Sequence, residues 1–313
     1  MSHYWMSAVL FFLAMGASLA QDAPKTEPSK EAASGVRRAR NIDPERLKQF
    51  RERLAGRSQP EGVDAKSGPT AGLELKSWTV DGKERTALVY FPKNESKSTA
   101  TPVVFIFHGH GGGSKHVASR FAIHKEWPEA ICVYPQGLPT AAPVIDPEGK
   151  RNGWQKYIGD QEDRDLEFFD AMLETLKKEH TIDAKRIYSA GHSNGGFFSY
   201  TLAAARGDLL AAIAPVAGTM NLRDLPQYKP IPIFHVAGEG DPIVKFAAQE
   251  RSLQQARKLN ACEAEGKKEG EHCTRYASEK GAVVVTYIHS GGHEIPQDAV
   301  PKIAAFFKEM EKK

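Results

Sequence analysis

The chain has 313 residues, of which 41% are hydrophobic, and this is enough apolar material for one large core or two modest domains. Charged residues make up 26% of the chain and the formal net charge is +3, with the basic excess confined to residues 21–70. The remainder is neutral overall, so composition argues against a protein that binds nucleic acid.

Residues 1–20 have the pattern of an export signal. The apolar run Ala8–Met15 is too short to span a bilayer, and the following Ser18-Leu19-Ala20 predicts cleavage before Gln21. The alternative is an uncleaved membrane anchor. We expect a secreted or periplasmic protein that has no membrane attachment once the signal is removed.

Residues 21–70 have the composition of a flexible linker or tether. They are rich in Pro, Ser, Glu, Lys and Arg and poor in aromatic residues, and such a segment cannot bury enough apolar surface to order itself. The predicted organisation is therefore a signal peptide over 1–20, a tether over 21–70 and a catalytic domain over 71–313.

Regular secondary structure is predicted from Leu73 onward. Leu73–Val80 and Arg85–Phe91 alternate apolar and polar residues around Asp81-Gly82, which predicts an antiparallel hairpin. Short apolar runs then alternate with helical patterns, which indicates an α/β fold with a mostly parallel sheet and helices on both faces. The predicted strands are 103–107, 130–134, 186–189, 211–216, 231–236 and 282–288, and the predicted helices are 162–179, 195–206, 246–259 and 298–311.

The strongest motif is Gly191-His192-Ser193-Asn194-Gly195-Gly196, which lies between a predicted strand and a predicted helix. The form G-x-S-x-G in this context is typical of the nucleophile elbow of the α/β-hydrolase fold. Ser193 is the predicted nucleophile, and the start of the helix places the backbone N–H of Asn194 beside the reacting carbonyl. The alternative is an ordinary glycine-rich turn.

A second glycine-rich loop, residues 108–113, follows the buried strand 103–107. Such a loop can bend toward the nucleophile and supply the other N–H of an oxyanion hole. We assign this donor to His110, with Gly111 the next choice, and expect His108 to be structural. The alternative is a phosphate-binding loop, but the lysine and the glycine spacing of the known phosphate motifs are missing.

A nucleophilic serine needs a base, and the base needs an acid that orients it. On this fold the acid follows the serine in the chain and the histidine comes last. The strand 231–236 leads to Asp241, which is the predicted acid, and Glu239 is its rival.

The last predicted strand, 282–288, leads to His293, the predicted base. Its competitor His289 lies at the strand end, where packing into the fold is the expected role. His235 lies within an apolar strand and is predicted to belong to the core.

Cys262 and Cys273 lie close together in a polar loop, whereas Cys132 lies in an apolar run. In an exported protein we expect the two loop cysteines to form a disulfide and Cys132 to be a buried thiol. The spacing resembles no zinc site, because four tetrahedral ligands are not in view. No metal or organic cofactor is expected.

These motifs together resemble the polyhydroxybutyrate depolymerase and feruloyl esterase family of secreted α/β-hydrolases. The resemblance covers about residues 75 to 313 and implies an ester hydrolase. Its substrate would be an aromatic-acid-substituted or acetylated plant polysaccharide, or a short-chain polyester. The chain departs from the family at His110, where a smaller residue or cysteine is common. The similar stretches are the loop at 108–113, Tyr134-Pro135-Gln136-Gly137, 163–173, 191–196, Gly240–Val244, the two loop cysteines and Gly291-Gly292-His293.

The insertion 138–160 is placed to form a wall of the acyl pocket. Trp154 within it either stacks on a phenolic acyl group or packs the loop against the body, and we name Trp154 and Gly111 as candidate substrate-binding residues. Feruloyl ester is the first choice of substrate, with acetylated xylan and short-chain polyester behind it. A peptidase of the same fold and a catalytically inactive binding module are the alternative functions.

Overall fold

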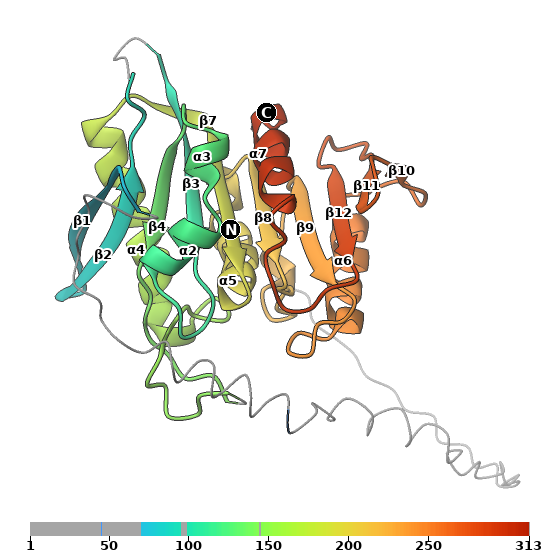
Figure 1. Ribbon diagram of the computed structural model, residues 1–313, viewed down its shortest axis with the longest axis horizontal. Coiled ribbons are helices and arrows are strands. Elements are labelled where there is room, and N and C mark those ends of the chain that lie inside the picture. Colours follow the sequence, from blue (N-terminus) through green and yellow to red (C-terminus); the bar gives the residue numbers. More distant parts are fainter. Residues whose placement is uncertain (1–44, 46–69, 95–98, 144, 313) are drawn as a thin grey trace, which may run out of the picture. The chain divides into compact units, whose positions relative to one another are not determined.

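The computed structural model describes Glu45 and residues 70–94, 99–143 and 145–312 (Figure 1). The predicted export signal therefore lies outside the described residues, as does the predicted tether apart from Glu45 and Thr70. The described residues belong to one unit, Ile42–Lys313. Among them, no helix has the length and apolar character needed to cross a membrane.

A large sheet forms the centre of the described part of the chain. Its strands, in chain order, are β1 Leu73–Val80, β2 Lys83–Tyr90, β3 Thr101–Phe107, β4 Ile131–Pro135, β7 Ile182–His192, β8 Ala212–Val216, β9 Ile233–Gly238, β10 Lys267–Lys268, β11 Cys273–Tyr276 and β12 Val284–His289. Their order across the sheet is β1-β2-β4-β3-β7-β8-β9-β12-β11-β10. The run from β4 to β12 is parallel, and antiparallel strands lie at both edges. A small separate ribbon pairs β5 Leu138–Pro139 with β6 Asn152–Gly153.

The predicted hairpin at the N-terminal edge is confirmed. Val80 pairs with Lys83, which leaves Asp81-Gly82 as a two-residue turn. Both turn residues have positive φ, 49° and 69°, as a type I′ turn requires. The strands β10 and β11 at the other edge were not predicted, because they are short and polar and show no alternating pattern.

Two layers of helices cover the sheet (Figure 1). The helices are α2 Ser114–Arg120, α3 Ile123–Glu126, α4 Arg164–Glu179, α5 Asn194–Arg206, α6 Phe246–Leu259 and α7 Ala299–Glu309. Residues of α2, α3 and α7 pack on one face of the sheet, and residues of α4, α5 and α6 pack on the other. The four predicted helices and the predicted α/β fold are confirmed. The short helices α2 and α3 were missed because two turns or fewer give little periodic signal.

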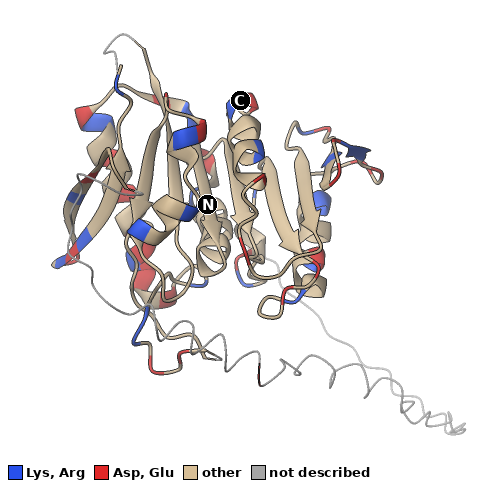
Figure 2. Ribbon diagram, viewed as in Figure 1, with Lys and Arg blue, Asp and Glu red and all other residues tan. Residues whose placement is uncertain are grey.

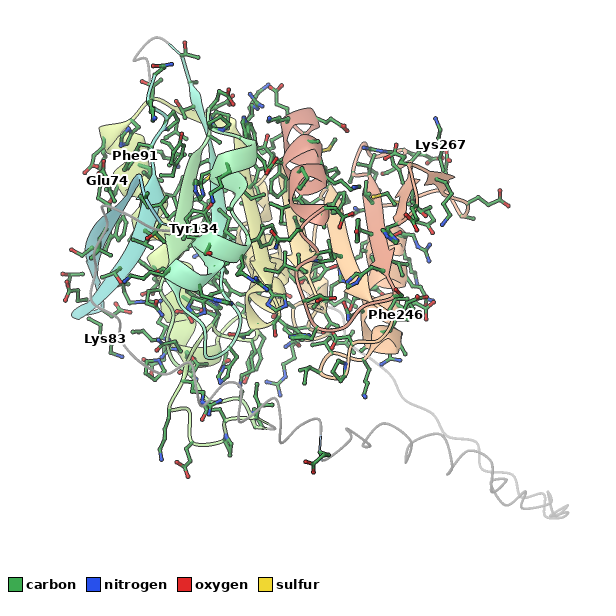
Figure 3. All side chains as sticks on the ribbon, viewed as in Figure 1. Glu74, Lys83, Phe91, Tyr134, Phe246 and Lys267 are labelled. Atoms are coloured by element: carbon green, nitrogen blue, oxygen red, sulfur yellow. The ribbon has the colours of Figure 1, made fainter. Side chains whose placement is uncertain are left out.

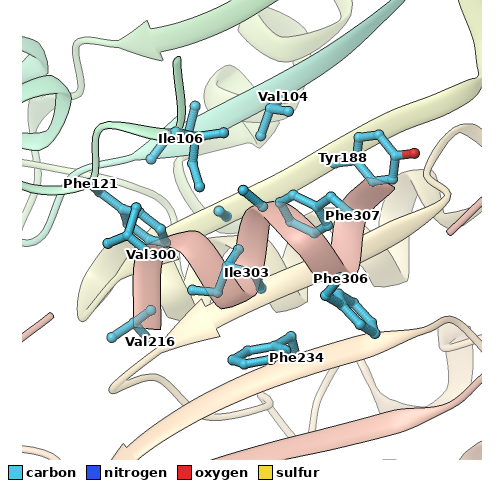
Figure 4. Packing of buried hydrophobic residues seen from close by; sticks show 14 of the residues in the cluster. Val104, Ile106, Phe121, Tyr188, Val216, Phe234, Val300, Ile303, Phe306 and Phe307 are labelled. Atoms are coloured by element: carbon cyan, nitrogen blue, oxygen red, sulfur yellow. The ribbon is translucent and has the colours of Figure 1, made fainter. Parts of the chain in front are cut away.

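The core is continuous through the sheet because the strands are apolar on both faces. In β3, Val104 and Ile106 face α7, whereas Phe105 packs on the opposite side. Figure 4 shows this α7 layer, in which the ring of Phe307 stacks on Tyr188 with centroids 4.7 Å apart. The sequences of β3, β4, β8, β9 and β12 contain no Lys, Arg, Asp or Glu, and charged residues lie on helices, loops and sheet edges instead (Figure 2).

The predicted disulfide between Cys262 and Cys273 is wrong, because both are free thiols. Cys262 bridges to Ser278, whereas Cys273 pairs with Tyr287. Ser278 lies five residues after Cys273, and a nearly extended chain of five residues spans about 16 Å. Cys262, which lies beside Ser278, is therefore too far from Cys273, because disulfide-bonded Cα atoms lie within about 7 Å of each other. The two cysteines also contact the hydrophobic clusters on opposite faces of the sheet. Cys132 is a buried thiol, as predicted.

The parallel strands end together at one edge of the sheet, the lower edge in Figures 1 and 3. The strands β8 and β9 point toward it, and Phe246, at the start of α6, lies there (Figure 3). Lys83, at the tip of the β1–β2 hairpin, lies at the same edge. The loops that follow β3, β7, β9 and β12 therefore meet there, and these loops carry the candidate site.

Candidate active site

Ser193 lies on a sharp turn between β7 and α5. Its φ is 55° and its ψ is −119°, a strained conformation for a residue with a side chain. The backbone N–H of Ser193 donates to Val216 O at 2.8 Å. A side chain at Gly191 would overlap the Gly195 carbonyl, and one at Gly195 would overlap that of Phe107. The motif needs glycine at these two places because the turn crosses neighbouring backbone at close range.

His293 bridges the serine and a carboxylate. Its Nε2 lies 2.7 Å from Ser193 Oγ, and its Nδ1 lies 2.8 Å from Asp241 Oδ2. An ionised carboxylate only accepts hydrogen bonds, so Nδ1 carries the proton and Nε2 accepts from the serine hydroxyl. The side chains of His293 and Asp241 are 7% and 0% exposed, so this contact is largely shielded from water.

The Asp241 carboxylate is held by several N–H donors. Its Oδ1 accepts from the backbone of Ile243 at 2.8 Å and of Val244 at 2.9 Å. Its Oδ2 accepts from Gln249 Nε2 at 3.2 Å in addition to the imidazole. The rival acid Glu239 is exposed, and the residue that contacts the imidazole is Asp241.

Two loops bring the acid and the histidine together. The strands β9 and β12 are parallel neighbours, and their pairing continues beyond the sheet. Glu239 N donates to His289 O at 2.8 Å, and Gly240 N donates to Gly291 O at 3.0 Å. His289 is buried, as predicted, and its Nδ1 accepts from the backbone N–H of Gly291. These backbone contacts aim His293, rather than His289, at the serine.

The backbone N–H groups of His110 and Asn194 are the predicted oxyanion donors. The loop after β3 passes next to the serine, because the Cβ of Ser193 is 3.3 Å from where a side chain on Gly109 would begin. Among the described residues, neither predicted N–H is hydrogen-bonded to an acceptor. The second choice, Gly111, is wrong, because its N–H already donates to Asn152 O at 2.7 Å. The same bond leaves Gly111 no free N–H for a substrate.

His108 is structural, as predicted. It is fully buried, and its Nε2 accepts from the backbone N–H of Gly137 at 2.9 Å. Its Nδ1 therefore carries the proton and lies 2.8 Å from Gly109 O. Burial lowers the pKa of His108 to about 4, so this ring stays neutral and holds two loops together.

Trp154 does not face the site, so its prediction as a substrate-binding residue is wrong. The side chain is fully buried. Its ring stacks on Phe198 at 5.5 Å and meets Phe107 edge-on at 5.1 Å. The indole N–H donates to His108 O at 2.8 Å. Of the two roles considered for Trp154, the structure supports packing of the insertion against the body.

The insertion 138–160 is fastened to both predicted oxyanion donors. The Asn194 side chain accepts from Trp154 N at 2.7 Å and donates to Trp154 O at 3.2 Å. His110 Nε2 lies 3.1 Å from Asp146 Oδ2. Burial lowers the pKa of His110, although the hydrogen bond to Asp146 opposes this effect. We call these contacts to Asn194 and His110 the insertion clamp.

Sequence reasoning missed Asp146 and Gln249, which contact residues of the site from outside the motifs. Neither lies in a glycine-rich loop or at a strand end, so no local signal marks them. Within the described residues, no cluster of His, Cys, Asp or Glu is arranged to hold a metal ion. A serine hydroxyl bonded to an imidazole that a buried carboxylate orients is the arrangement of an activated nucleophile.

Known proteins with similar sequences are esterases. Feruloyl esterase D of Neurospora crassa is 26% identical over 244 residues, which cover 74% of this chain and 81% of the relative. A bifunctional acetylxylan esterase/xylanase of Neocallimastix patriciarum is 27% identical over 187 residues, which cover 58% of this chain and 25% of the relative. The chain is an α/β-hydrolase esterase related to the feruloyl esterases. The prolyl oligopeptidase family model matches residues 147–265 of this esterase.

Solved structures place the esterase in the same fold. A thermostable esterase superposes with a TM-score of 0.58 at 18% identity, over 77% of this chain and 63% of that chain. The acetyl xylan esterase from Aspergillus awamori gives a TM-score of 0.57 at 13% identity, over 74% of this chain and 99% of that chain. A feruloyl esterase module from Clostridium thermocellum complexed with sinapinate gives a TM-score of 0.55 at 11% identity, over 80% of this chain and 94% of that chain. At these identities the likeness concerns the fold.

Proposed function

We propose that this esterase hydrolyses feruloyl or acetyl esters of plant polysaccharide through Ser193, His293 and Asp241. The observation that carries the proposal is the continuous contact from the Ser193 hydroxyl through the imidazole to the buried carboxylate. The relatives named feruloyl esterase and acetylxylan esterase support the substrate class.

The first step is acyl transfer to the serine. His293 Nε2 takes the Ser193 proton as the oxygen attacks the ester carbonyl. The backbone N–H groups of Asn194 and His110 bind the negative charge that develops on the carbonyl oxygen. Asp241 stabilises the imidazolium, which then protonates the departing alcohol. In the second step, water is activated by the same imidazole and releases the acid from the serine.

Export is the second part of the proposal. The apolar run and the small residues within 1–20 support a cleaved signal, and export would bring the enzyme to a polysaccharide that is too large to enter a cell. The mass of the protein recovered from the producing cells tests this, because cleavage before Gln21 removes a fixed mass.

Replacement of the nucleophile tests the mechanism. We expect Ser193→Ala to lower kcat on p-nitrophenyl acetate and methyl ferulate by about 10⁴–10⁶, because the acyl-enzyme can no longer form. The control is Ser77→Ala, the same change at an exposed position on the edge strand β1. Turnover by Ser193→Ala at the level of the control would remove Ser193 from the mechanism, whereas selective loss supports it.

A substrate panel tests the acyl group and the class of bond. The match to the prolyl oligopeptidase family favours one second candidate, a peptidase, since the same triad also cleaves amides. Methyl ferulate, acetylated xylan, a hydroxybutyrate oligomer and peptide substrates are compared by kcat/KM. We expect the highest value on one of the first two. A highest value on the oligomer indicates a polyester hydrolase, and one on peptides indicates a peptidase.

A further inference from the structure

A chain of buried hydrogen bonds continues from the triad carboxylate into the core. Its first member is Gln249, in the first turn of α6, whose side chain is fully buried. The amide Nε2 donates to Asp241 Oδ2 at 3.2 Å and to Val244 O at 2.7 Å. Both N–H bonds are thereby used, and the amide oxygen faces away from the carboxylate.

The second and third members are His235 on β9 and Tyr200 on α5. The His235 Nε2 lies 3.4 Å from Gln249 Oε1, and its Nδ1 lies 2.7 Å from the Tyr200 hydroxyl. Because Gln249 Oε1 can only accept, His235 Nε2 carries the proton and Nδ1 accepts from the tyrosine. The donors thus all point along one line, from Tyr200 through His235 and Gln249 to Asp241.

The side chains of this hydrogen-bond network are neutral up to the Asp241 carboxylate. Burial lowers the pKa of His235 to about 4 and raises the pKa of the Tyr200 hydroxyl. Both rings are fully buried, so water does not compete for these bonds. Asp241 Oδ2 is therefore shared by two N–H donors, the His293 imidazole and the Gln249 amide.

We propose that Gln249, oriented by His235 and Tyr200, is a positioning residue that fixes the Asp241 carboxylate against His293. This inference rests on the proposed function. The two backbone donors of Ile243 and Val244 hold only Oδ1. Among the described residues, Oδ2 is held by Gln249 and by the His293 imidazole that it orients. The Tyr200 hydroxyl lies 2.7 Å from His235 Nδ1, and by donating to that nitrogen it supports the tautomer whose proton is on Nε2, toward Gln249 Oε1.

Removal of the Gln249 amide has two expected effects. The carboxylate becomes less well oriented, so kcat falls while substrate binding is unaffected, because Gln249 does not face the substrate. The carboxylate also loses a donor that shares its charge, so it attracts the protonated imidazole more strongly. The acid limb of the pH profile of kcat/KM therefore moves to higher pH.

The test compares Gln249→Met with Gln254→Met, the same change at an exposed position on the same helix. For Gln249→Met we expect kcat on methyl ferulate to fall about tenfold to a hundredfold, with KM unchanged and the acid limb displaced to higher pH. The control keeps the wild-type values. An unchanged kcat, or a lower kcat with an undisplaced acid limb, in a folded Gln249→Met would overturn the proposal.

A second variant and an internal reference complete the test. Tyr200→Phe removes only a hydroxyl and is measured by thermal unfolding and by the pH profile. If Gln249→Met fails to fold, a displaced acid limb in Tyr200→Phe supports the proposal and an undisplaced limb overturns it. Ser193→Ala is assayed alongside. Retained turnover in Ser193→Ala contradicts the proposed function, whereas an unchanged Gln249→Met beside an inactive Ser193→Ala contradicts the positioning role alone.

Discussion

The position of the nucleophilic hydroxyl is fixed by the backbone conformation of a single residue, Ser193. The left-handed φ of Ser193 presents its hydroxyl at the end of β7 while the chain turns into α5. This conformation costs about 1–3 kcal/mol in a residue with a side chain, and it persists because close packing at Gly191 and Gly195 leaves the chain no other path. The local cost is offset by the buried strand and helix on either side.

Gly195→Ala tests this packing at the level of one methyl group. The new Cβ would overlap the carbonyl of Phe107, so we expect a loss of about 1–3 kcal/mol in the free energy of unfolding. The control is Gly207→Ala, because a Cβ there meets open space and the φ of −55° suits any residue. Urea unfolding measures both. Equal stability of the two variants would contradict the packing argument.

At the scale of elements, the insertion 138–160 contacts both residues of the predicted oxyanion hole, and its role as a wall of the acyl pocket stays a prediction. Its aromatic residue, Trp154, is packed inside, and its polar groups fasten Asn194 and His110. Two segments far apart in the chain thus hold the two predicted donors. The insertion clamp acts through these donors, so its loss affects the transition state more than substrate binding.

Asp146→Ala tests the insertion clamp. The carboxylate holds the His110 ring and the backbone N–H groups of Lys150 and Arg151. We expect kcat to fall about tenfold or more with little change in KM. Without Asp146 the His110 ring is no longer anchored, so the backbone N–H of His110 is no longer fixed in place. The matched control is Glu148→Ala, whose side chain is 66% exposed on the same loop. A change in KM alone would show that the loop binds substrate instead.

At the scale of the whole molecule, burial of neutral histidines links folding to pH. Burial lowers the pKa of His108, His124 and His235 from 6.5 to about 4. The unfolded chain therefore binds more protons than the folded chain between pH 6.5 and 4. The stability that these histidines contribute is fully present above pH 6.5, their pKa in the unfolded chain, and is lost progressively as the pH falls from 6.5 to 4.

We accordingly expect the free energy of unfolding to decrease on acidification from pH 6.5 to 4, with a slope from these three groups of at most about 4 kcal/mol per pH unit. Urea unfolding at a series of pH values measures the slope. In the variant His124→Asn, which removes a ring whose Nδ1 lies 2.6 Å from the Tyr134 hydroxyl, the slope should fall by the contribution of about one proton. An unchanged slope in that variant would show that His124 does not contribute.

Much of the fold follows from local patterns in the sequence. The Asp81-Gly82 turn with alternating flanks predicted the first hairpin, and apolar runs predicted the six parallel strands. These signals are legible because strand and helix impose different periods on the burial of side chains. The elbow around Ser193 is equally local, since its glycines and its flanking strand and helix are contiguous in the chain.

Some features of the protein depend on which face of the sheet a residue lies on and which residues it contacts, and local patterns in the sequence do not reveal these. The proximity of Cys262 and Cys273 in the chain favoured a disulfide, but both are free thiols, and they contact hydrophobic clusters on opposite faces of the sheet. Trp154 lies on a polar loop, yet three aromatic neighbours from distant segments bury it. The fold class, the elbow and the chain order of the candidate residues could be predicted from the sequence alone, because each depends on contiguous residues. Which histidine reaches the serine, and which amide holds the acid, depends on contacts between loops and helices that form only when the sheet is assembled.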